Sequence, residues 1–161
     1  MSTIQFLSQN GMNKVFEQFA SADTNISSYG YGNLFDQNGQ PKSQQRYPGM
    51  FVQPTRTEVI SNNFTINRTY QILIYDTLAS DRSNENSVVS DCEEYAFRLC
   101  RFLKNKSDVF NVVGNPVVTP FSDKFLDDVS GVIVDVVIEF NGEASDCNDP
   151  DYSFDIKFND I

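Results

Sequence analysis

The sequence contains no histidine and no tryptophan among its 161 residues. Without histidine, the chain lacks the side chain that most often acts as a general base, and it excludes Ser-His-Asp and Cys-His catalytic arrangements. The glycine-rich phosphate-binding motifs GxxxxGK[ST] and GxGxxG are also absent. We therefore expect a protein that is not an enzyme and that uses no cofactor.

Cysteine is scarce, and long apolar runs are missing. Cys92, Cys100 and Cys147 form no CxxC pair, and their odd number argues against a disulfide scaffold. No apolar run approaches the roughly 20 residues that a membrane span needs. The N-terminus has no basic stretch followed by an apolar block, so no secretory signal is expected. We expect a chain that folds in a reducing compartment and does not interact with a membrane.

The apolar content is sufficient for one packed core. Hydrophobic residues make up 40% of the chain, which includes fourteen phenylalanines, and this composition excludes the disordered class. The length fits one domain, so we predict a single domain over residues 1–161.

Hydrophobic periodicity predicts two helices and several strands. The helices are expected over about 12–22 and about 87–105. The strands are expected at 49–53 (ended by Pro54), 55–60, 64–76, 109–118 (broken at Gly114–Pro116), 131–140 and 152–158. This order predicts an α+β fold with a mixed or antiparallel β-sheet, flanked by an N-terminal helix and one long central helix.

The central helix has the strongest pattern. Its apolar residues recur at helical spacing: Val88, Val89, Cys92, Ala96, Leu99 and Leu103. Ser90 and Glu93 fit a capping box, with Asn86 or Ser87 as other caps. Glu94 and Arg98 are spaced to form an ion pair one turn apart.

Two segments have two interpretations each. The extended loop at about 23–47, with Tyr29 and Tyr31, either packs internally or contacts another subunit. The C-terminal residues Tyr152, Phe154, Ile156 and Phe158 alternate as in an amphipathic strand. This strand or arm, at about 152–161, belongs either to the domain's own sheet or to the sheet of a neighbouring subunit.

Negative charge is concentrated in the last quarter of the chain. Residues 121–161 contain eleven acidic and two basic residues, which disfavours tight binding to nucleic acid. Asp146, Asp149, Asp151 and Asp155 form either an ordinary solvated surface or a surface that repels DNA. Calcium binding by the acidic turn is the weaker alternative because the spacing does not match an EF-hand. A carboxylate hydrolase is also disfavoured by the absence of tryptophan and histidine.

Several segments together resemble a known group of phage proteins. They are SSYGYGNLFD and RYPGMFVQP (27–36 and 46–54), the stretch from TYQILIYD to CRFL (69–103), TPFSDKFLDDVSGVIVDVVIEF (119–140) and DCNDP (146–150). In this order they resemble virion neck or tail ring proteins, of the tail-completion or tail-terminator type, from Bacteroidota tailed phages that include crAss-like phages.

The resemblance implies a structural virion protein with a tail-terminator-like fold. Such a protein is made in the bacterial host cytoplasm and forms a homo-oligomeric ring in the neck or tail, next to portal, adaptor or tail proteins. The ring joins head to tail, and it lines or seals the conduit through which genomic DNA passes without specific binding. The alternative is a non-viral module that binds a small ligand or a peptide on its exposed sheet.

Overall fold

The computed structural model describes residues 8–32, 46–106, 109–122 and 129–141. They form one five-stranded mixed sheet with two helices, which confirms the predicted α+β class. The elements are α1 (Gln9–Ala22), β1 (Ser28–Tyr31), β2 (Gly49–Ile60), β3 (Thr65–Thr77), α3 (Glu85–Lys104), β4 (Asn111–Ser122) and β5 (Val129–Asn141).

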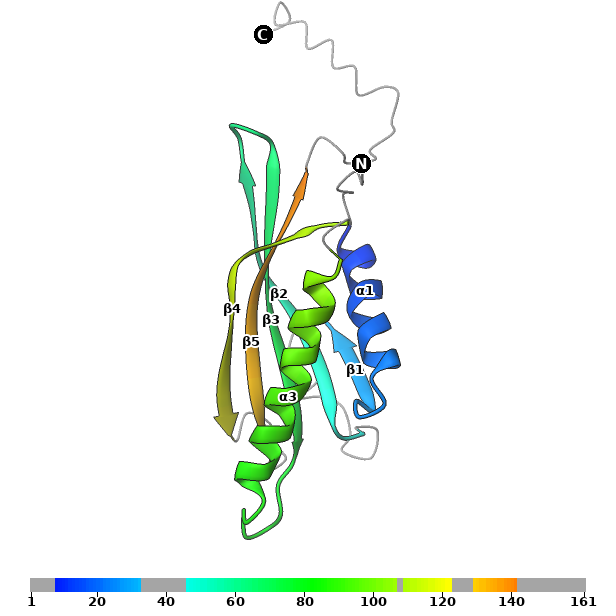
Figure 1. Cartoon of the computed structure of the whole chain (residues 1–161), viewed down its shortest axis with the longest axis vertical. Coiled ribbons are helices and arrows are strands. Elements are labelled where there is room, and N and C mark those ends of the chain that lie inside the picture. The colour runs from blue at the N-terminus through cyan, green and yellow to red at the C-terminus, as the bar shows by residue number, and fades with distance from the viewer. Residues whose placement is uncertain (1–7, 33–45, 107–108, 123–128, 142–161) are drawn as a thin grey trace, which may run out of the picture.

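The strand order across the sheet is β1-β2-β3-β5-β4. Only the β1–β2 pair is parallel, and the other neighbours are antiparallel. Both helices lie on the same face of the sheet (Figure 1). The main core therefore forms between the helices and this face, and β1 and β4 are the two edge strands of the described sheet.

The side chains of β5 alternate between the two faces of the sheet. Val132, Val134, Val136, Ile138 and Phe140 are all buried against the helices, whereas Asp135 and Glu139 point to the opposite face. That opposite face has an apolar cluster of its own at one end of the sheet, formed by Phe51, Leu73, Tyr75, Phe121, Val129 and Ile133. Burial on both faces explains why neighbouring residues of β3 such as Ile72, Leu73 and Ile74 are all buried.

Helix α1 begins earlier than predicted, at Gln9 and not at about residue 12. The side chain of Ser8 caps the helix by accepting a hydrogen bond from the Gly11 amide at 3.1 Å. Gly11 therefore lies within the first turn and does not interrupt the helix.

The predicted loop at 23–47 contains a strand that the sequence pattern did not reveal. Residues Ser28–Tyr31 form β1, which pairs with β2 from Gly49 to Val52. A four-residue strand with a central glycine is too short to show a period-2 pattern, so turn residues dominated the prediction. Residues 33–45 of the predicted loop lie outside the described part of the chain.

Proline does not end β2. The prediction of two short strands separated by Pro54 is wrong, because one strand runs from Gly49 to Ile60. The register with β3 shifts between Pro54 and Arg56, which leaves Thr55 as the extra residue of a β-bulge. The break predicted at Gly114–Pro116 is a similar register shift between Val113 and Val117, and β4 continues to Ser122.

Helix α3 starts at Glu85, before the capping residues that the sequence suggested. Its N-cap is Asn84, whose side-chain oxygen accepts a hydrogen bond from the Ala79 amide at 2.7 Å and makes no cap bond. The predicted capping box at Ser90 and Glu93, and the alternative caps Asn86 and Ser87, are therefore wrong because all four residues lie inside the helix. No helix in the described ranges is long and apolar enough to cross a membrane.

Candidate interaction groove between α3 and β4

Two separate hollows lie one after the other between α3 and the edge strand β4. One flank is a stripe of α3 side chains at three- or four-residue spacing, which places them on one side of the helix: Glu85, Val89, Glu93, Phe97, Cys100, Arg101 and Lys104. The other flank is β4. We call the two hollows together the α3–β4 groove, and it has an acidic part and a basic part.

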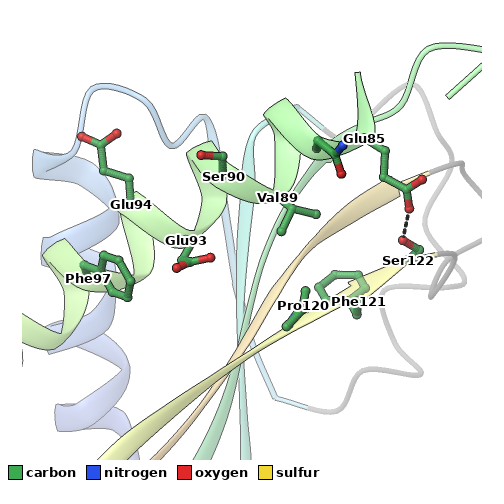
Figure 2. Close-up of a pocket in the computed structure, with 10 residues that line it drawn as sticks. Glu85, Val89, Ser90, Glu93, Glu94, Phe97, Pro120, Phe121 and Ser122 are labelled. Carbon is green, nitrogen blue, oxygen red and sulfur yellow. Dashed lines mark hydrogen bonds between the residues drawn. The ribbon is translucent and has the colours of Figure 1, made fainter. Parts of the chain in front are cut away.

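The acidic part of the groove has a volume of about 760 Å³ and lies beside the N-terminal half of α3 (Figure 2). Glu85, Glu93 and Glu94 supply its charge, and Val89, Phe97, Pro120 and Phe121 supply apolar surface. The side chain of Phe97 is 52% exposed, which is unusual for a large aromatic residue on a packed helix.

The basic part has a volume of about 500 Å³ and lies beside the C-terminal half of α3. Arg101 and Lys104 supply positive charge, and Cys100, Val112 and the bulged segment Gly114–Pro116 complete the walls. Gly114 has a φ of 66°, a left-handed conformation that glycine adopts without strain.

The change of sign along the groove follows from the polarity of α3. Acidic side chains are favoured near a helix N-terminus and basic ones near its C-terminus. Glu93, Arg101 and Lys104 form no ion pair with any described residue. These charges are therefore available to a partner.

Hydrogen bonds within the chain hold one end of the groove together. Ser122 donates a hydrogen bond to the carboxylate of Glu85, and its hydroxyl lies 3.2 Å from that of Ser130. Ser130 in turn donates to the Phe121 carbonyl at 2.8 Å. These bonds join the start of α3 to the end of β4, and the end of β4 to the start of β5. In the described ranges, no group of three or more His, Cys, Asp or Glu residues is arranged to hold a metal ion.

Tyr29 and Tyr31, the predicted interface residues of the loop, bond to α1 within the same chain. The Tyr29 hydroxyl donates to the side-chain oxygen of Asn13 at 2.8 Å. The Tyr31 hydroxyl donates to the Gln9 side-chain oxygen, to which Tyr70 also donates at 3.2 Å. Both tyrosines are half-buried, and burial raises the pKa of each phenol. Internal packing thus accounts for their hydroxyl groups, and a role at a subunit interface stays a prediction.

The remaining predicted site residues lie outside the described ranges. They are the C-terminal aromatic and apolar residues Tyr152, Phe154, Ile156 and Phe158 and the acidic residues Asp146, Asp149, Asp151 and Asp155.

The two cysteines of α3 differ in position. Cys92 is fully buried in the core, and burial, together with the nearby charges of Asp76 and Asp91, raises the pKa of its thiol to about 12. Cys100 is half-buried at the wall of the basic part, and burial raises the pKa of its thiol as well. Cys92 is thus a small core residue, as its place in the apolar pattern of the helix predicts, whereas Cys100 also reaches the groove.

Sequence reasoning did not identify the groove, although its α3 flank was visible. The stripe from Glu85 to Lys104 has helical spacing. The position of β4 beside this stripe depends on the strand order, which periodicity does not specify.

No protein-family model matches this chain, and no curated protein is significantly similar to it.

Proposed function

We propose that this protein is a structural subunit of a homo-oligomeric ring in the neck or tail of a tailed bacteriophage. The ring joins the head at the portal to the tail, and it lines or seals the DNA conduit. The protein performs no catalysis in this role. The resemblance of its sequence segments to neck and tail ring proteins is the starting point of the proposal.

The structural observation that supports the proposal is the presence of two different open edges on one sheet. On one side, β1 covers only residues 49–52 of β2, so the rest of β2 is an edge among the described strands. On the other side, β4 exposes Val113 and Val117, the latter by 55%. Contacts between two different surfaces are heterologous, and heterologous contacts generate rings when the rotation closes.

Edge strands are sites where chains associate unless they are protected. Here the β4 edge carries a bulge and two prolines, Pro116 and Pro120, which lack amide donors. These features disfavour uncontrolled strand pairing along the whole edge. They favour a contact that uses the side chains and the groove beside the strand.

The acidic quarter of the chain supports passage of DNA without binding. The electric field of a cluster of negative charges extends over about one Debye length, which is about 8 Å at physiological ionic strength. Within that distance the field repels DNA, which is a polyanion. Positive charge on the described residues is confined to scattered single residues and to the basic end of α3, and phosphate-backbone binding needs more extensive basic surface.

The test is the oligomeric state of the full-length protein, measured by mass photometry alone and after mixing with portal and tail proteins of a tailed phage. We expect a closed oligomer in at least one of these mixtures, and we expect mass spectrometry to detect the chain in purified particles. A strict monomer in every mixture that is also absent from particles would contradict the proposal. The alternative, a non-viral binding module, predicts that result together with retention of a peptide or small ligand.

A further inference from the structure

We propose that the basic part of the α3–β4 groove receives the acidic C-terminal segment, residues 146–158, of a neighbouring copy of the same chain. This inference rests on the proposed ring function and specifies the contact that holds adjacent subunits together. Its three supports are charge, shape and the position at which β5 ends.

The charges of the two partners are opposite. Residues 142–161 contain six acidic residues and one lysine, a net charge of −5. The basic part of the groove presents Arg101 and Lys104, which have no ion-pair partner among the described residues. The acidic part of the groove would repel the same segment, so the charge pattern selects one end of the groove.

The shape and chemistry of the basic part suit an extended acidic segment. Val112 and Pro116 offer apolar walls beside the two cations. At the start of the segment, Asp146 and Asp149 lie on either side of Cys147. Such a segment can place these carboxylates near Arg101 and Lys104, and its aromatic residues follow further along the chain.

The chain leaves the sheet near this end of the groove. Asn141, the last residue of β5, is two residues beyond Glu139, which pairs with Asn111 at the start of β4. The twenty residues that follow can span roughly 65 Å when extended, which is ample to reach an adjacent subunit. The segment and the groove are separate surfaces of one chain, so each subunit can donate to one neighbour and accept from the other.

Two cysteines of the chain can report this contact, because Cys100 lines the basic part and Cys147 is the second residue of the segment. A step of two residues along an extended strand covers about 6.6 Å, and a step of four residues along a helix covers about 6 Å. The two steps therefore match in length. A segment lying along α3 with Cys147 beside Cys100 therefore has Asp149 beside Lys104. A disulfide forms only when the two Cα atoms come within about 7 Å of each other.

The experiment is oxidation of the full-length protein with diamide at about pH 9, where the half-buried Cys100 thiol ionises more readily. We expect disulfide-linked dimers and higher species on a non-reducing gel, joined through Cys100 and Cys147 as identified by mass spectrometry. The Cys100→Ser and Cys147→Ser variants should each lose these species. The double variant Arg101→Glu/Lys104→Glu should form them about tenfold more slowly.

A charge-matched control is the double variant Lys14→Glu/Arg46→Glu, which reverses two exposed cations away from the groove and should cross-link at the wild-type rate. Three results would overturn the inference. They are the absence of a Cys100–Cys147 disulfide, a disulfide formed only within one chain, and cross-linking of the Arg101→Glu/Lys104→Glu variant at the wild-type rate. Mass photometry in reducing buffer distinguishes failure of the groove contact from failure of the proposed ring function. An oligomer without the bond overturns only the groove contact, whereas a monomer in every mixture overturns both.

Discussion

At the scale of single residues, one ion pair connects the two helices. Arg98 on α3 contacts the carboxylate of Asp23 through two nitrogens, at 2.9 and 3.1 Å. The Asp23 side chain is only 6% exposed, and it also accepts a hydrogen bond from the Asn25 amide at 3.0 Å. Two parallel bonds between a guanidinium and a carboxylate fix the orientation of both groups, so this pair sets the position of α1 relative to α3.

Replacing Arg98 with methionine should lower the free energy of unfolding by about 2 kcal/mol, because the buried Asp23 carboxylate would lose its main partner. The value is below that of a fully buried pair because Arg98 is about one-third exposed. Urea denaturation measures the effect. A matched control is Arg56→Met, since Arg56 and its partner Glu58 are both well exposed. An equal loss in the two variants would contradict the special role of Arg98.

The same pair predicts how stability depends on acid. Burial alone would raise the pKa of Asp23, but hydrogen bonds from Arg98 and Asn25 outweigh it and hold the pKa below its ordinary value of 3.8. The stabilising contribution is therefore complete above about pH 4 to 5, and it is lost as the pH falls through the lowered pKa. Melting temperatures measured between pH 6 and pH 3 should fall less steeply for Asp23→Asn than for the wild type. Identical slopes would show that Asp23 does not contribute.

Gly131 on β5 is a position that no other residue should occupy. A Cβ atom there would lie 2.0 Å from the Ile74 carbonyl oxygen, which belongs to the backbone of the neighbouring strand. We expect Gly131→Ala to cost about 3 kcal/mol. Gly49→Ala is the comparison, because its Cβ would meet only the ring of Tyr75, at 2.7 Å. If chemical denaturation shows an equal or larger loss for Gly49→Ala, this account of Gly131 is wrong.

At the scale of elements, aromatic packing attaches α1 to the sheet. Phe16 is completely buried, and its ring lies edge-on to Tyr70 with the centroids 5.2 Å apart. Phe19 packs against Phe102 of α3 at 5.4 Å. The Asn13 and Gln9 side chains add polar contacts with the tyrosines of β1. Because α1 is the element that covers β1, loss of its apolar contacts should affect that edge of the sheet first.

Phe16→Ala should therefore destabilise the protein by about 3–5 kcal/mol, as expected for removal of a buried aromatic ring. Phe97→Ala removes the same side chain from a half-exposed position in the groove and should cost less than about 1 kcal/mol. Thermal unfolding of the two variants gives the comparison. A large loss for Phe97→Ala would indicate a structural role for this residue and would weaken its assignment to a binding surface.

At the scale of the whole molecule, the described residues are nearly neutral and most of the net charge of −10 lies elsewhere in the chain. The described sheet and helices therefore account for little of the net charge.

Deletion of residues 152–161 should impair assembly more than folding, since the deletion removes the aromatic part of the C-terminal segment. Circular dichroism should show a melting temperature close to that of the full chain, while mass photometry shows loss of the oligomer. A truncated chain that fails to fold would place this segment in the core of its own subunit.

The sequence alone determined the class of the fold and most of its elements. The helix pattern of α3 and the alternation along β5 are strong because each buries one continuous side of an element, and burial sets a period of 3.6 or 2. The ion pair between Glu94 and Arg98 was predictable for a similar reason, since only the turn of one helix is involved, and the structure confirms it at 3.4 Å.

Features that depend on neighbours in space required the tertiary structure. Strand β1 has too few residues to show a period, and it exists because β2 offers a parallel partner for Ser28–Tyr31. Pro54 is tolerated because a bulge accommodates it, and a bulge is a relation between two strands. The α3–β4 groove likewise arises only when the strand order places β4 at the edge beside α3. Local periodicity fixes which side chains share a face, whereas long-range strand pairing decides which faces meet.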